Sequence, residues 1–388
     1  MRTLISPTGR AATARLRTLT VSGLAAAVAL AVIPHSAAQG PVQAELTAAA
    51  FADPNWELPR FSWGDPNLEG TFTSRDMSGV QMERSPQYGT RESMTPEEFA
   101  NRGRGGRGGG GLLGQRGGDE FEGRARLQLS ALDSGETGTR TFGYTSYLID
   151  PPDGRMPATV GRGGRGGGGG QANGPFYTME DFSYYDRCIT RGILGSIMPS
   201  LYGDAMRIVQ SPTEVAISYE MLHDTRIIPL DGRPQADRGV RQHMGSSVGH
   251  FEGDTLVIET TNVTDEVGIG RYAVSPDVVL TERITRIDPE MINYVVTVDD
   301  PATYERPWTF RMTLTTQPDY EILEYSCHEG NFFVANALRA EKVYQERVAD
   351  AVANGEPIPD RPGAGGAAGL SIYQAPSSED AVNINTGE

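Results

Sequence analysis

The sequence predicts a mainly β protein in which an antiparallel meander closes into a lipocalin-like barrel and one helix follows near the C-terminus. Two observations support this prediction. Short β-prone runs follow one another from about residue 205 to 327, and turn signals of a few residues separate them. A later stretch, 334–354, carries apolar residues near helical spacing. A β-sandwich is the alternative, because seven or eight such strands also pack as two sheets.

The N-terminal 38 residues have the layout of a secretory signal peptide. Residues 1–17 contain four arginines and no acid, an apolar run extends to Ile33, and Ser36 and Ala38 are the small residues of a cleavage site. We expect cleavage after Ala38 and a periplasmic or secreted mature protein, with an uncleaved N-terminal anchor as the alternative. No later stretch approaches the roughly 20 apolar residues of a membrane span.

The charge balance argues against two classes of partner. The chain has 34 Lys and Arg against 50 Asp and Glu. Since four of the arginines lie in the leader, the mature chain keeps 30 basic against 50 acidic residues, a net charge of −20. Such a surface repels nucleic acid and anionic membranes. A small-molecule ligand is therefore the expected partner, and the sequence indicates no oligomeric state.

Residues 39–340 form a single predicted β-rich domain with two glycine-rich loop insertions, at 102–118 and 161–170. These loops have too few apolar residues to form a core, and we expect them to be flexible. The second loop contains G-x-G-x-x-G, but it lies outside any strand-to-helix unit, so we predict no dinucleotide cofactor. Residues 341–388 are expected to complete the helix and then form a flexible tail.

Cys188 and Cys327 are the two cysteines of the chain. In an oxidising compartment, an isolated pair far apart in the sequence most simply forms one disulfide. Metal binding is less favoured, because neither cysteine has a second cysteine nearby.

The strands are predicted in order from their β-prone composition. The turns between them contain Gly, Pro, Asp or Asn, as in "DGRP" at 231–234 and "EGD" at 252–254. We also expect "GSSVG" at 245–249 to be a loop over the barrel mouth. The predicted strand runs are 206–210, 215–222, 223–230, 250–251, 255–263, 280–287, 292–300, 308–316 and 321–327.

Several motifs resemble a family of exported bacterial proteins that has no assigned activity. The resemblance spans roughly residues 55 to 340 and implies an exported, single-domain β protein. The glycine-rich loops, Gln235 and His243 depart from the family pattern, so it assigns no metal or proton role to those two positions. The motifs are "DPNLEGTFT", "LIDPPDGRMP", "RIVQSP", "HDTRIIPLDGRP", "GHFEGDTLVIETTN", "LTERITRID", "TVDDPATYERPWT" and "EYSCHEGN".

Histidines and strand acids are the candidate catalytic residues. After loss of His35 with the leader, four histidines remain, all between 223 and 328 and each beside carboxylates or arginines. An acid or base that works near neutral pH needs a tuned histidine or carboxylate, and a charged neighbour supplies the tuning. The alternative is that each histidine makes a local backbone bond. The candidates are His223, His250, His328 and Glu259.

The candidate ligand-binding residues are charged groups within apolar runs. Such groups persist inside a fold only if they are paired, solvated in a cavity or in contact with a ligand. We expect His223, Arg226 and His328 to line one polar cavity with at least one strand glutamate. The ligand-binding candidates are Glu220, Asp224, Arg226, Glu282 and Arg311.

Two other chemistries are weaker alternatives. The four histidines could assemble a metal shell, but no H-x-H or H-E-x-x-H spacing is present, and we predict no metal. Ser247 is the centre of a G-x-S-x-G motif, yet a hairpin follows it instead of the helix that a nucleophile elbow needs. The sequence therefore predicts an exported barrel that encloses a small organic or sugar-like ligand. An acid–base enzyme with arginine holding an anionic group, and a non-catalytic binding or carrier protein, both stay open.

Overall fold

The computed structural model describes residues 46–77, 79–101, 142–160, 175–199, 203–264, 274–316 and 320–361. The predicted leader 1–38, the glycine-rich loops 102–118 and 161–170, and the tail beyond residue 361 lie outside these ranges. The statements that follow concern the described residues.

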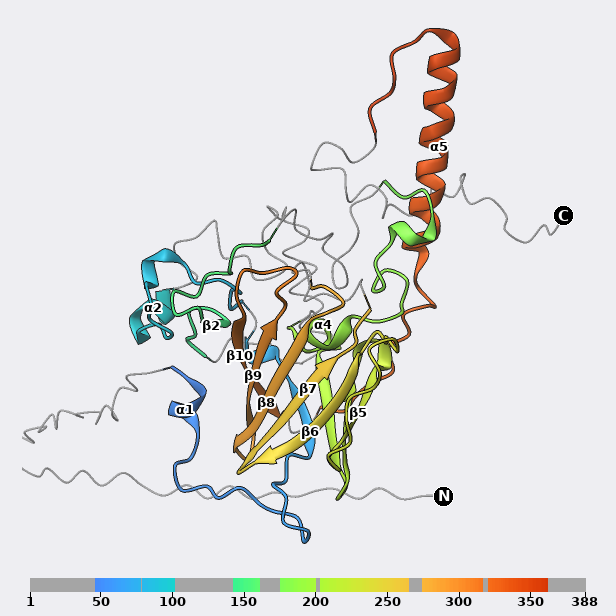
Figure 1. Cartoon of the computed structure of the whole chain (residues 1–388). Coiled ribbons are helices and arrows are strands. Elements are labelled where there is room, and N and C mark those ends of the chain that lie inside the picture. The colour runs from blue at the N-terminus through green and yellow to red at the C-terminus, as the bar shows by residue number, and fades with distance from the viewer. Residues whose placement is uncertain are drawn as a thin grey trace, which may run out of the picture. The chain divides into compact units, whose positions relative to one another are not determined.

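Ten strands form one antiparallel sheet in the order β5-β4-β3-β1-β10-β9-β8-β7-β6, and β2 also pairs with β10 (Figure 1). The mainly β fold is thus confirmed. The strands are β1 (Gly70–Thr73), β2 (Leu148–Asp150), β3 (Ala205–Gln210), β4 (Glu214–Tyr219), β5 (Thr225–Pro229), β6 (Ser246–Glu252), β7 (Thr255–Thr261), β8 (Val279–Asp288), β9 (Met291–Asp299) and β10 (Trp308–Thr316). The α-helices are α1 (Ala48–Phe51), α2 (Pro96–Asn101), α4 (Gly192–Ile197) and α5 (Phe332–Asn354).

Two runs of consecutive strands pair with their sequence neighbours, as the turn signals predict. They are β3 to β5 and β6 to β10. The predicted turns at Gly232 and Gly253 are present, and both glycines have positive φ, +74° and +61°. Arg233 donates hydrogen bonds to both carboxylate oxygens of Asp231 and braces the first turn. This contact holds the pKa of Asp231 at about 2.

An N-terminal strand joins the two runs. β1 lies between β3 and β10, with Gly70 opposite Ile208 and Phe72 opposite Thr316. The two outer strands, β5 and β6, share no hydrogen-bonded pairing in the part of the chain that the structure describes. They still approach closely, because a Cβ added at Gly249 of β6 would lie 2.8 Å from Cγ2 of Ile228 in β5. The sheet is therefore not closed by hydrogen bonds.

One face of the sheet buries the hydrophobic core. Alternation places every second side chain of a strand on this inner face, where Trp308 and Phe310 are fully buried. The register aligns Ile258 with Glu282, Glu282 with Val296, and Val296 with Phe310 across four strands. Glu282 is thus a buried acid in a row of apolar residues, and its role depends on the side chains that bind its carboxylate.

The prediction of a strand at 321–327 is wrong. The segment runs without strand pairing before α5. Its backbone amides at Leu323 and Tyr325 donate to the side chains of Glu220 and His223. Side chains from the β4–β5 connection therefore take the place that a neighbouring strand would occupy.

The prediction of a loop at 245–249 is also wrong. Residues from Ser246 onward belong to β6, which pairs with β7 along its length. Ser247 is buried on the inner face, and its hydroxyl lies 2.8 Å from that of Thr260. This strand position does not provide the strained turn that exposes a nucleophilic serine.

The predicted C-terminal helix is confirmed as α5. It ends at Gly355, which has the left-handed conformation (φ +69°) that commonly ends helices. Near its start, the ring of Phe333 packs edge-on against those of Phe176 and Phe182, with centroids 5.8 and 5.7 Å apart.

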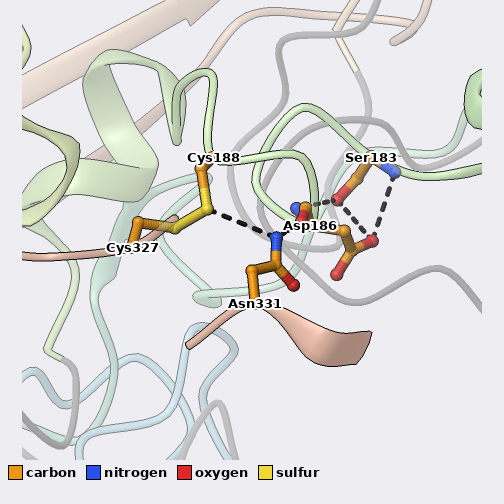
Figure 2. Close-up of a disulfide and its surroundings, with 5 residues drawn as sticks. All are labelled: Ser183, Asp186, Cys188, Cys327 and Asn331. Atoms are coloured by element: carbon orange, nitrogen blue, oxygen red, sulfur yellow. Dashed lines mark hydrogen bonds between the residues drawn. A yellow bond between two sulfur atoms is a disulfide. The ribbon is translucent and has the colours of Figure 1, made fainter. Parts of the chain in front are cut away.

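Cys188 and Cys327 form the predicted disulfide, with their Cα atoms 5.8 Å apart (Figure 2). Asn331, the residue before α5, donates a hydrogen bond to the main-chain oxygen of Asp186 at 2.7 Å and another to Sγ of Cys188 at 3.4 Å. The carboxylate of Asp186 in turn accepts from the hydroxyl of Ser183. The disulfide and Asn331 thereby connect the beginning of α5 to segment 183–188.

Candidate functional site

Arg226 and Glu282 form a buried ion pair on the inner face of the sheet. Arg226 of β5 donates to both carboxylate oxygens of Glu282 in β8, and each N–O distance is 2.7 Å. Thr260 of β7 and Tyr294 of β9 donate to the same carboxylate. The side chains of the ion pair are 2% and 0% exposed. One carboxylate therefore connects four strands.

Burial and charge shift the pKa values around this pair. Although burial alone lowers the pKa of Arg226, the adjacent carboxylate of Glu282 raises it well above its ordinary value. Burial raises the pKa of Tyr219 to about 12, and burial together with Glu282 raises that of Tyr294 well above its usual range. The arginine stays charged and the tyrosines stay neutral, so this cluster does not provide a base for neutral pH. The two predicted ligand residues bind each other.

Glu220 and His223 hold segment 320–325 against the β4–β5 connection. The carboxylate of Glu220 accepts hydrogen bonds from the hydroxyl of Tyr320 at 2.6 Å and from the amide of Leu323 at 3.0 Å. Nε2 of His223 accepts from the amide of Tyr325 at 3.1 Å. His223 thus binds a backbone amide, as the alternative for the histidines proposed, but this amide is distant in sequence and not local.

The other predicted inner-site residues do not gather. Asp224 is partly buried and accepts a hydrogen bond from the hydroxyl of Thr190 at 2.6 Å, while burial raises its pKa. His250, Glu259 and His328 are exposed, as is His223, whereas Arg226 is buried against Glu282. The structure therefore does not bring these histidines together with Arg226.

A cavity of about 620 Å³ lies on the other face of the sheet, beside β8, β9 and β10. Of the residues predicted for the site, Arg311 lines it. Its floor comes from the three strands, and its remaining boundary comes from α1, the segment before α2 and Tyr144. The lining residues are Thr47, Ala48, Ala49, Arg91, Glu92, Ser93, Met94, Thr95, Tyr144, Ile287, Asn293 and Arg311.

Arg311 and Asn293 form the polar part of the cavity floor. Asn293 of β9 lies opposite Thr313 of β10, two residues along from Arg311, so both side chains project from the same face. Nη2 of Arg311 donates to the carboxylate of Glu92 at 3.0 Å. The guanidinium carbon also lies 4.5 Å from the ring centroid of Tyr144. A cation is thus held between an aromatic ring and one carboxylate.

Tyr144 joins the roof of the cavity to its floor. Its hydroxyl accepts a hydrogen bond from the amide of Ala48 in α1 at 2.8 Å and lies 3.2 Å from the hydroxyl of Thr313 in β10. The aromatic ring that packs on Arg311 is therefore fixed at its far end.

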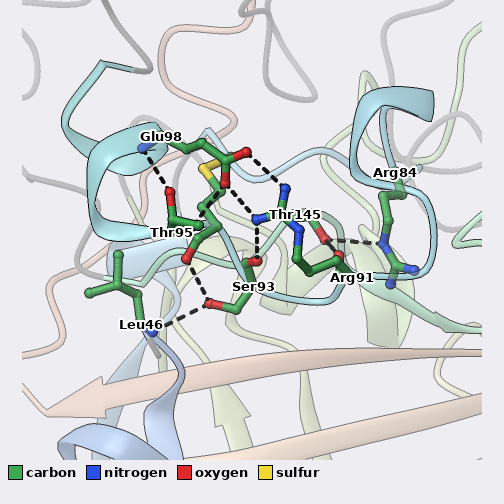
Figure 3. Close-up of polar contacts among 8 residues, drawn as sticks. Leu46, Arg84, Arg91, Ser93, Thr95, Glu98 and Thr145 are labelled. Atoms are coloured by element: carbon green, nitrogen blue, oxygen red, sulfur yellow. Dashed lines mark hydrogen bonds and ion pairs between the residues drawn. The ribbon is translucent and has the colours of Figure 1, made fainter. Parts of the chain in front are cut away.

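The wall of the cavity, residues 91–95, is held by a polar network (Figure 3). Arg91 donates to both carboxylate oxygens of Glu98 at 2.6 and 2.8 Å. Glu98 accepts from the amide of Thr95, and the hydroxyl of Thr95 accepts from the amide of Glu98, which is a capping box at the start of α2. These hydrogen bonds, that from Arg91 above all, lower the pKa of Glu98 to about 2.

A buried arginine supports this wall from behind. Arg84 is 1% exposed, and its Nε donates to the hydroxyl of Thr145 at 3.0 Å. That hydroxyl donates to the main-chain oxygen of Arg91 at 2.6 Å. Hydrogen bonds within the protein therefore fix the cavity wall.

Comparison with known proteins adds no assignment to the site. The chain has no match among protein-family models, curated proteins or solved structures. Within the described ranges, no three or more His, Cys, Asp and Glu side chains lie together as metal ligands would. No helix in those ranges has the length and apolar character to cross a membrane.

Proposed function

We propose that the protein binds a small organic molecule with an anionic group in the cavity beside β9 and β10. The observation that carries this proposal is the position of Arg311, whose guanidinium lies at the cavity floor, packs on Tyr144 and, among the residues that the structure describes, has Glu92 as its one acidic partner. Arginine recognises carboxylates with a planar set of donors. The volume of about 620 Å³ also lies within the roughly 300–1,000 Å³ of small-molecule sites.

The geometry favours binding over acid–base catalysis. The four candidate catalytic residues, His223, His250, His328 and Glu259, are not among the residues that line the cavity. The carboxylate that lines it, Glu92, is paired with Arg311. The binding-protein interpretation therefore explains the arrangement without a proton-transfer group.

Export and a barrel-like closure are part of the same proposal. The leader-like N-terminus and the disulfide support an exported protein. The close approach of Gly249 to Ile228 supports a sheet whose two edges meet through side chains. In this arrangement the inner face is filled by the core, and the ligand binds outside it.

A cavity-filling variant tests the proposal. Ala49 lines the cavity from α1, so Ala49→Phe should occupy part of the space. We expect ligand-observed NMR with a library of small organic acids to find compounds whose binding is lost in this variant. Ala335→Phe, at an exposed alanine of α5, is the matched control and should keep those compounds. Hits that bind Ala49→Phe as well as the wild type would contradict the proposed site.

A further inference from the structure

We infer that Glu92 is an internal counter-ion of Arg311 which the carboxylate of a ligand replaces, so that the cavity selects small monocarboxylates with an apolar body. This inference rests on the proposed binding function and specifies its ligand class. It follows from three features of the cavity: the fixed position of Arg311, the exposure of Glu92 and the separate engagement of Arg91.

Arg311 is fixed and keeps donors for a second partner. Its backbone is paired with β9, and its amide donates to the main-chain oxygen of Tyr147 at 2.9 Å. The ring of Tyr144 packs on the guanidinium. A guanidinium has five N–H donors, and the bond to Glu92 uses Nη2. A carboxylate that enters the cavity therefore meets an oriented cation.

Glu92 is the partner that can leave. Its side chain is 48% exposed, whereas that of Arg311 is 20% exposed. A half-exposed carboxylate returns to water at small cost, because exposed ion pairs contribute little net stability. The backbone of Glu92 stays in place, since its main-chain oxygen accepts from the amide of Thr145 at 2.9 Å. The exchange thus requires a rotation of one side chain and no change in the wall.

Arg91 is not an equivalent second cation. Both of its terminal nitrogens donate to Glu98, and the same Glu98 carboxylate caps α2 through the amide of Thr95. Releasing Arg91 to a ligand would break two hydrogen bonds, of 2.6 and 2.8 Å, whereas one bond of 3.0 Å holds Arg311 to Glu92. One available arginine matches one carboxylate, so a second carboxylate on the ligand should add little affinity.

The rest of the cavity suits an apolar body. Ala48, Ala49, Met94 and Ile287 line it together with Tyr144. Apolar atoms of a ligand gain free energy when these side chains remove them from water. Asn293 also lines the cavity on the same face as Arg311, and its side-chain amide adds a neutral hydrogen-bond donor to the floor.

Hexanoate, hexanamide and adipate test the ligand class, with affinities measured by NMR titration of the full mature protein. We expect hexanoate to bind at least tenfold more tightly than hexanamide, and adipate to bind within about threefold of hexanoate. Arg311→Gln should weaken hexanoate binding at least tenfold, and Arg311→Lys should weaken it less because the charge remains. Equal binding of hexanoate and hexanamide, or tenfold tighter binding of adipate, would overturn the inference. Melting curves show whether each variant folds.

Glu92→Gln tests the exchange itself. If Glu92 competes with the ligand, its removal should tighten hexanoate binding by roughly two- to fivefold, the range that an exposed ion pair allows. If Glu92 instead positions Arg311, the same variant should weaken binding, and the inference fails. Glu97→Gln removes an exposed acid of α2 outside the cavity lining and should change the affinity less than twofold. Binding that survives these failures but is lost in Ala49→Phe would leave the proposed function standing.

Discussion

Replacing Glu282 with leucine should lower the free energy of unfolding by about 3–5 kcal/mol, the usual result when one partner of a buried ion pair is removed. The structure gives the reason for a large effect. Arg226 would keep its charge with its side chain 2% exposed and would lose both hydrogen bonds of 2.7 Å. Thr260 and Tyr294 would lose the acceptor that they share.

An exposed pair on the same strand provides the control. Arg283 of β8 donates to Glu252 at 2.8 Å, but these side chains are 44% and 50% exposed. Glu252→Gln should therefore destabilise the fold far less than Glu282→Leu, because solvent screens an exposed pair. Glu282 is buried and also accepts from Thr260 and Tyr294, whereas Glu252 is half exposed, so Glu282→Leu should be much the more destabilising of the two.

The double variant Arg226→Met with Glu282→Leu removes both charges. It should unfold within about 1 kcal/mol of the wild type or be more stable, because replacing a buried pair with apolar side chains is often neutral or stabilising. Urea denaturation followed by the fluorescence of the buried Trp308 measures all four proteins. The reasoning is refuted if Glu282→Leu costs less than about 1 kcal/mol, or if the double variant is as unstable as that single variant.

Three further predictions concern the disulfide, a buried tyrosine and the leader. Replacing Cys188 and Cys327 with serine should cost about 4–5 kcal/mol, because the disulfide spans 139 residues; a thiol titration of the denatured, unreduced wild type should find no thiol, and two would contradict the bond. The pKa of Tyr219, about 12 against an ordinary 10, stabilises the fold below pH 10, and this contribution should be lost as the pH rises from 10 to 12. Absorbance at 295 nm should show one fewer tyrosine ionising near pH 12 in Tyr219→Phe than in the wild type, whereas the pKa of Tyr294 lies well above its usual range in the wild type. The exported protein should begin after Ala38 by intact mass, and a chain that keeps residues 1–38 would contradict this.

The strands with one buried face were predictable from sequence, whereas the order of the sheet was not. The run 308–316 is observed as β10, and its first five residues alternate buried and partly buried. β1 has four residues and β2 has three, too few for a period of two to stand out. β1 also joins β3 to β10 through contacts that are distant in sequence, and composition carries no information about such pairing.

The candidate site was predicted in part. Glu282 and Arg226 were both predicted to be paired, solvated or in contact with a ligand, and in the structure they are paired with each other. The cavity was missed, apart from Arg311, because much of its lining comes from segments 47–49 and 91–95, which have no strand or helix periodicity. The T-x-x-E spacing of Thr95 and Glu98 is a capping-box signal that would have placed the start of α2.

Glu282 and Arg311 were predicted to belong to one ligand site, but the strand register places them on opposite faces of the sheet. Glu282 lies opposite Val296 of β9, and Arg311 lies opposite its neighbour Val295. Adjacent residues of a strand point to opposite faces, so the acid enters the core while the arginine faces the cavity. Each charge has a partner on its own face. The pair Arg226–Glu282 is structural, because both of its side chains are buried. In the pair Arg311–Glu92 the carboxylate is half exposed, so a ligand can replace it. A difference of one residue in register thus separates a pair that stabilises the fold from a pair that a ligand can displace.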